Sequence, residues 1–138
     1  MRAATSPFMK VWDCLRDRRG VALIEFAFGA ALFVISLMGI IEFSRVLWIR
    51  NTLQHAADEA GHYAMIHAGA TQDQLISYTK QAAAPLDTSA ITVTVSWDTA
   101  DGTTFVTILA NYQVGIMVPF LPENSIPVAG RARVPQIS

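Results

Sequence analysis

The chain has 138 residues, of which 52% are hydrophobic and 15% are charged, and its formal net charge at pH 7 is -1. The length allows one modest domain plus an extension. The composition is too apolar for an ordinary small soluble domain, so we expect a membrane segment. The balanced charge offers no basic surface to nucleic acid, and the single cysteine, Cys14, excludes an internal disulfide.

A long apolar run, residues 21–41, follows a basic N-terminal segment and contains one charged residue, Glu25. As a helix it would be about 31 Å long at 1.5 Å per residue, which matches a bilayer core of about 30 Å. Basic residues are more frequent before the run than just after it, so we expect residues 1–20 to be a cytoplasmic leader and residues 21–41 a transmembrane helix. The basic residues before the run are Arg2, Lys10, Arg16, Arg18 and Arg19, and those just after it are Arg45 and Arg50.

Two export signals compete with this interpretation. A cleaved secretory signal has an apolar region of about 7–15 residues and a small-x-small cleavage site, whereas this run is longer and no such site follows it. The pair Arg18-Arg19 is only a weak indication of twin-arginine export. A retained single-pass anchor is therefore favoured, and Trp48, just past the run, is typical of an interfacial aromatic residue.

Glu25 is the residue in the apolar run that needs an explanation. A charge at the centre of a membrane helix costs about 2.5–3.5 kcal/mol on insertion scales. Glu25 lies about one turn inside the cytoplasmic end, so its cost should be lower. The carboxylate either reaches the interface or is protonated, or it has a functional role, as acidic residues within membranes usually have. The residues alone leave both interpretations open.

The helix should continue past the membrane, since residues 41–68 lack proline and are rich in alanine. Spacings of three and four predict one apolar stripe suited to close packing, made of Leu53, Ala56, Ala57, Ala60 and Ala64. We expect a single helix over residues 21–68, with Gly39 as a candidate bend. Thr71 and Gln74 have the spacing of a capping box for a second helix, which should run to about Ala84.

Alternating apolar residues after Pro85 predict strands. The first strand has Ile91, Val93, Val95 and Trp97 on one face, and the second has Val106, Ile108, Ala110, Tyr112 and Val114. Asp101-Gly102 between them is a hairpin signal. Residues 117–127 contain three prolines and are predicted to form a loop. A third strand, at an edge of the sheet, should turn Val128, Gly130, Ala132 and Val134 inward, with Arg131 and Arg133 on its other face.

These elements predict an α+β fold. A long N-terminal transmembrane helix continues outside the membrane, and a short second helix and a three-stranded antiparallel β-meander follow it. The expected divisions are an extracytoplasmic helical region over residues 42–84 and a small antiparallel β region over residues 85–138.

Candidates for enzyme chemistry are few. His55, Glu59 and His62 share a helical face, but they lack the H-E-x-x-H spacing and lie where solvated residues belong. We expect His67 to be partly buried and structural. No glycine-rich phosphate loop or serine–histidine–acid set is visible. We therefore expect no enzymatic activity, no catalytic residue, no bound metal and no cofactor.

The segment that opens the apolar run resembles a prepilin-peptidase site. Pilins and pseudopilins carry a basic leader ending in glycine, followed by an apolar segment with glutamate at its fifth position, as in Gly20, Val21 and Glu25 here. The similarity extends through residues 39–45, Gly-Ile-Ile-Glu-Phe-Ser-Arg, and the alanine-rich residues 53–64. This pattern resembles the TadE-like family, whose members are membrane-anchored pseudopilins of tight-adherence (Flp-type) pilus systems.

The resemblance implies a role for each of these residues. A prepilin peptidase would cleave between Gly20 and Val21, and Glu25 would pair with the new Val21 amine of a neighbouring subunit. The implied partners are that peptidase, other pseudopilins, the major pilin, the inner-membrane assembly platform and the lipid bilayer. The implied location is the bacterial inner membrane, with a cytoplasmic N-terminus and a periplasmic C-terminal region. The alternative is an unprocessed single-pass membrane protein that presents a small extracytoplasmic binding domain.

Overall fold

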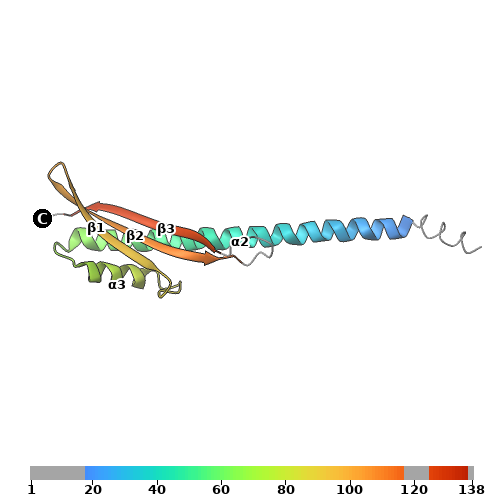
Figure 1. Cartoon of the computed structure of the whole chain (residues 1–138), viewed down its shortest axis with the longest axis horizontal. Helices are drawn as coiled ribbons and strands as arrows, with labels where there is room; N and C mark the ends of the chain where they lie inside the picture. The colour runs from blue at the N-terminus through green and yellow to red at the C-terminus, as the bar shows by residue number, and fades with distance from the viewer. Residues whose placement is uncertain (1–17, 117–124, 137–138) are drawn as a thin grey trace, which may run out of the picture. The chain divides into compact units, whose positions relative to one another are not determined.

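The computed structural model describes residues 18–116 and 125–136. Within these residues, two helices precede three strands, as predicted for the α+β class (Figure 1). The elements are α2 (Arg18–Ile66), α3 (Gln72–Ala82), β1 (Thr92–Ala100), β2 (Thr103–Gly115) and β3 (Ser125–Pro135). The chain divides into two compact units, Met1–Gly39 and Ile40–Ser138, which are described separately.

The described part of the first unit is the beginning of α2. This segment lacks proline and consists mostly of alanine and large apolar residues, and nearly all of them are exposed. Leu23, Ile24, Phe26 and Phe28 each leave more than half of their surface uncovered. A helix that is apolar on all sides is typical of a membrane span or of the core of a large protein, and not of a surface in water. Helix α2 continues through Gly39, the candidate bend, into the second unit.

The second unit contains one antiparallel sheet in the order β1-β2-β3. Asp101 and Gly102 connect β1 to β2 with φ angles of 52° and 77°, as a two-residue hairpin requires. Val95, Ile108 and Ala132 lie beside one another on the buried face. On the other face, Arg133 forms an ion pair with Asp98 at 2.5 Å.

Strand β3 corrects the predicted loop over residues 117–127. The strand begins at Ser125, and Pro127 lies opposite Gln113 of β2, while residues 117–124 lie outside the described part. The backbone N–H and C=O of Arg131 point away from β2, because both bond to the side chain of Gln54. Alternate residues of a strand share this direction, so Pro127 and Pro135 remove no hydrogen bond from the ladder. The predicted edge position of the third strand is confirmed.

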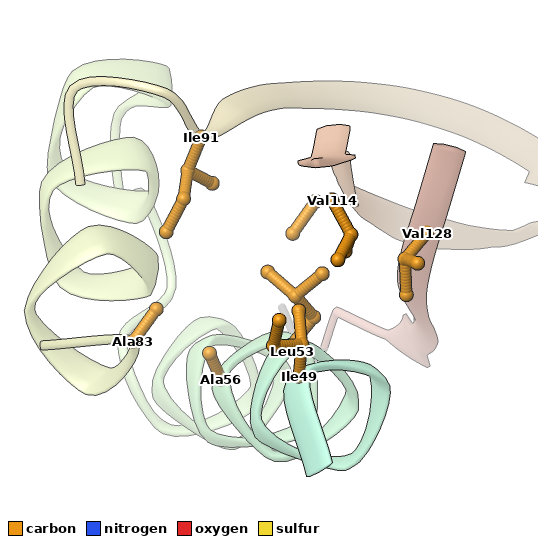
Figure 2. Packing of buried hydrophobic residues seen from close by; sticks show 8 residues of the cluster. Ile49, Leu53, Ala56, Ala83, Ile91, Val114 and Val128 are labelled. Atoms are coloured by element: carbon orange, nitrogen blue, oxygen red, sulfur yellow. The ribbon is translucent and has the colours of Figure 1, made fainter. Parts of the chain in front are cut away.

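Helix α2 packs on the sheet through the predicted stripe of small residues. Leu53, Ala56, Ala57 and Ala60 are completely buried, and Ala64 is nearly so. Figure 2 shows Ile49 and Leu53 of α2 pointing toward Val114 of β2 and Val128 of β3, and the same cluster also contains Ala56, Ala83, Ile91 and Ala110. A second cluster joins Ala60 and Ala64 to Leu75 of α3 and to the strands through Val95, Val106 and Ile108.

The helix ends differ slightly from the prediction. The Thr71–Gln74 capping box is confirmed: the Gln74 N–H donates to the Thr71 hydroxyl at 3.4 Å, and the Thr71 N–H donates to the Gln74 side chain at 3.0 Å. Helix α2 ends at Ile66, before Gly69, whose φ is 99°. His67 therefore lies beyond the last helical turn, and the prediction that it is partly buried is wrong: its ring is exposed and stacks on Tyr63.

Candidate functional site

The three residues predicted to form the processing and pairing site lie close together at the start of α2. Gly20 and Val21 are in its first turns, and Glu25 lies one turn after Val21 on the same side of the helix. All three are exposed, and a β-carbon added at Gly20 would meet no atom within 4 Å. The helix itself therefore does not require glycine at this position. Cleavage at Gly20–Val21 would first require local unwinding, because a helical peptide bond is held within the hydrogen-bonded turn.

The apolar part of α2 meets the requirements of a membrane span. Within the described residues, one helical segment, Gly20–Ile66, is long and apolar enough to cross a membrane by length and composition, with a window of mean hydropathy 2.3 that is entirely unburied. Its hydroxyl groups bond within the helix: Ser36 Oγ donates to the Leu32 carbonyl at 2.8 Å, and Ser44 Oγ donates to the Ile40 carbonyl at 2.8 Å. These hydroxyl groups therefore already have hydrogen-bond partners within the helix and need none from the lipid.

A hydrogen bond from Arg45, whose side chain is also ion-paired with Glu42 on the same helix, ties α2 to the end of β2. Arg45 donates to the two carboxylate oxygens of Glu42, from Nη2 at 2.6 Å and from Nε at 3.3 Å. The Arg45 Nη2 also donates to the carbonyl oxygen of Gly115. The hydrogen bond with Glu42 raises the pKa of Arg45 above its ordinary value, so this guanidinium remains cationic. These contacts hold Gly115, the last residue of β2, beside the part of α2 with which the second unit begins.

A second tie joins α2 to the free edge of β3. The Gln54 side chain donates from Nε2 to the Arg131 carbonyl at 2.9 Å and accepts from the Arg131 N–H at 3.1 Å, as a neighbouring strand would. Asp58 Oδ1 accepts a further bond from Gln54 Nε2 at 3.0 Å, which orients the amide. Gly130 makes the approach possible, since a β-carbon there would overlap the backbone of Leu53.

Sequence reasoning missed both ties. The opposite charges of Glu42 and Arg45 three residues apart on a helix were an available signal for the ion pair. Glycine within a strand, as at Gly130, often marks a close backbone approach. No local pattern distinguishes Gln54 from other exposed polar residues of α2, because its partner lies far along the chain.

The weak metal-ligand candidates do not form one site in this structure. His55 and Glu59 line a cavity of about 330 Å³ with Tyr78 and Gln81, but His62 is not among its lining residues. Within residues 18–116 and 125–136, no three histidine, cysteine or acidic residues are grouped so that they could hold a metal ion.

Comparison with protein families matches residues 20–62 to the model described as TadE-like protein. The matched segment begins at Gly20, includes Glu25, Glu42 and Arg45, and ends within the part of α2 that packs on the sheet. The match confirms the predicted resemblance. Neither the search of curated proteins nor that of solved structures returned a match. Together with the candidate membrane helix, the family match supports a single-pass membrane protein associated with tight-adherence pili.

Proposed function

We propose that the protein is a pseudopilin or minor pilin-like component of tight-adherence pilus assembly, anchored in the bacterial inner membrane by residues 21–41. The observation that carries this proposal is the family match over residues 20–62, which covers the whole exposed apolar segment of α2. The basic residues before this segment favour a cytoplasmic N-terminus and a periplasmic head.

The proposed role is structural rather than catalytic. The polar contacts of Arg45 and Gln54 hold helix and sheet together, which favours a rigid head carried on a helical anchor. The proposed partners are a prepilin peptidase, other pseudopilins, the major pilin, the inner-membrane assembly platform and the surrounding lipid, without nucleic acid.

Processing is proposed at the Gly20–Val21 bond. Because no atom lies near the missing β-carbon of Gly20, the need for glycine would come from the peptidase active site and not from this fold. The cut would create an α-amine on Val21 that is largely cationic at neutral pH. Glu25 would then pair with that amine of a neighbouring subunit. Within one chain the two residues are also a helical turn apart, so pairing between subunits competes with pairing inside one helix.

The test is the mass of the mature protein. We expect a mass that begins at Val21 when the chain is produced with an active prepilin peptidase. Gly20→Leu should abolish this cut and leave the protein folded and in the membrane. Gly29→Leu is the matched control, because a β-carbon at Gly29 also meets nothing within 4 Å. Retention of residues 1–20 in the unsubstituted protein, beside an active peptidase, would instead support the unprocessed single-pass alternative.

A further inference from the structure

The second unit has an apolar groove. One wall of the groove is made by the residues of α2 that follow the predicted span most closely in the sequence. The groove has a volume of about 430 Å³. We call it the basal groove and define it by Phe43, Val46, Leu47 and Arg50 of α2 and by Ile126 and Pro127 of β3. Phe43 is 69% exposed and Ile126 is 41% exposed, so large apolar side chains on both walls are open to the surroundings.

The two walls of the basal groove are held in place by contacts described above. Residues 43, 46, 47 and 50 recur at helical spacing, so they form one face of α2. The bonds between Gln54 and Arg131 keep β3 against α2 just beyond this face. The Arg45 bond to Gly115 fixes the neighbouring end of β2. The groove is therefore a preformed feature of the head.

The position of the groove along α2 indicates what it meets. At 1.5 Å per residue, Phe43, Leu47 and Arg50 follow residue 41 by about 3, 9 and 14 Å. The headgroup layer on each side of the hydrocarbon core is about 5–7 Å thick. Side chains on a helix lean toward its N-terminus, which is here toward the membrane, and an arginine stem lets the guanidinium reach back toward the headgroups. Trp48, half exposed on the same part of the helix, is a residue type enriched at this depth.

We propose that the basal groove binds a phospholipid of the adjacent leaflet. The upper part of an acyl chain would lie between Phe43 and Leu47 on one side and Ile126 on the other, and Arg50 would bind the lipid phosphate. The order of the lining residues along α2 supports this occupant. The apolar residues lie nearer the membrane centre and the exposed cation Arg50 lies farther from it, as the acyl chain and the charged headgroup of a lipid do. The first residues of β3 are then a second membrane contact, in addition to the helical anchor. This inference relies on the proposed anchoring by α2.

A fluorescence quenching experiment on the full chain tests the depth of the groove. Single cysteines at Ile126, Leu37 and Ile66 are introduced into a Cys14→Ser background and labelled with an environment-sensitive dye. The protein is placed in vesicles of phosphatidylethanolamine and phosphatidylglycerol that carry a nitroxide on the acyl chain. Leu37, within the predicted span, reports anchoring itself, and Ile66, an exposed apolar residue at the other end of α2, is the control outside the membrane.

We expect strong quenching at Leu37 and at Ile126 and little at Ile66, at every protein-to-lipid ratio. Quenching at Leu37 with none at Ile126 would overturn the lipid site and leave the anchor intact. Absence of quenching at Leu37 would refute the anchor as well. If the label at position 126 loses its quenching only at high protein density, a second protein copy occupies the groove. That result would also overturn the proposal.

The role of Arg50 is tested by lipid selectivity. The comparison is between quenching by spin-labelled phosphatidylglycerol and quenching by a spin-labelled diacylglycerol, which has the same acyl chains but no phosphate. Arg50→Gln should lower the preference for phosphatidylglycerol at Ile126 by up to about fivefold, since one basic residue near an anionic surface contributes about 1 kcal/mol. Arg133→Gln removes the same charge from the outer face of the sheet and should leave the preference unchanged. An unchanged preference in Arg50→Gln would refute the assigned phosphate contact.

Discussion

Replacement of Gly130 by alanine should destabilise the head severely. A β-carbon at this position would lie 2.5 Å from the backbone nitrogen of Gln54 and closer still to the carbonyl group of Leu53. An ordinary nonbonded contact is about 3.5 Å, so β3 and α2 would have to separate by about 1 Å. Backbone atoms of a helix cannot move aside as the end of a flexible side chain can.

The size of the effect follows from what this separation breaks. Overpacking a close-packed interface costs about 1–3 kcal/mol. The two bonds between Gln54 and Arg131 would also be lost, each with a net contribution of about 0.5–1.5 kcal/mol. We therefore expect Gly130→Ala to lower the free energy of unfolding by about 2–6 kcal/mol, a large share of the roughly 5–15 kcal/mol typical of a folded domain.

Gly61→Ala is the matched control on the same interface. Its added β-carbon would lie 3.1 Å from Cγ1 of Val134 and 3.4 Å from the β-carbon of Ala132, and these are side-chain atoms. Replacing glycine within a helix also recovers about 0.5–1 kcal/mol of helix propensity. We expect a net change near zero, well below that of Gly130→Ala.

The assay is urea unfolding of the full chain in detergent, with brief proteolysis to measure the folded fraction of the head. If Gly130→Ala loses its stability through the separation of β3 from α2, adding Gln54→Ala to it should have little further effect, although Gln54→Ala alone is destabilising. Unfolding of Gly130→Ala at the same urea concentration as Gly61→Ala would refute the reasoning, as would full additivity of the Gln54 and Gly130 effects.

Three further predictions concern the anchor and its connection to the head. Arg45→Met should lower the stability of the head by about 1–2 kcal/mol in the same assay, because Glu42 loses an ionic partner and Gly115 loses a donor; unchanged stability would contradict the proposed tie. Glu25→Ala should leave insertion and cleavage intact but weaken crosslinking to other pseudopilins and reduce pilus output, and normal crosslinking with normal pili would remove the pairing role. Alkaline phosphatase fused after Ser138 should be active, since this enzyme needs the non-cytoplasmic side, and a cytoplasmic result would overturn the proposed orientation.

Much of the local structure could be predicted because it depends on residues close in the chain. The spacing of Leu53, Ala56 and Ala60 identified the buried face of α2, and Thr71 with Gln74 identified the start of α3. Alternation in β2 and the Asp101-Gly102 turn identified the first hairpin. A periodic pattern states which side of an element is apolar, and a capping pattern is complete within one turn.

Which apolar residues of a strand are buried by the helices could be learned only from the tertiary structure. Trp97 is on the same face of β1 as Val95, yet it remains 41% exposed whereas Val95 is buried. Both residues lie on the edge strand β1, so the edge position does not separate them; Val95 is covered because it packs in the cluster of Ala60, Ala64 and Leu75. Ile91 is buried although it precedes the strand. The alternation of side chains was predicted, but the extent of the helices that cover them was not.

The sequence by itself determined the apolar anchor, the order of the elements and the inward face of each strand, because hydropathy and periodicity are local properties. Only the tertiary structure showed that Arg45 reaches Gly115 and that Gln54 closes the free edge of β3. It also showed that Phe43 and Ile126 share one groove. Each of these pairs is far apart in the chain, and a hydrogen bond or an apolar contact forms only where folding brings the two partners within a few ångströms of each other.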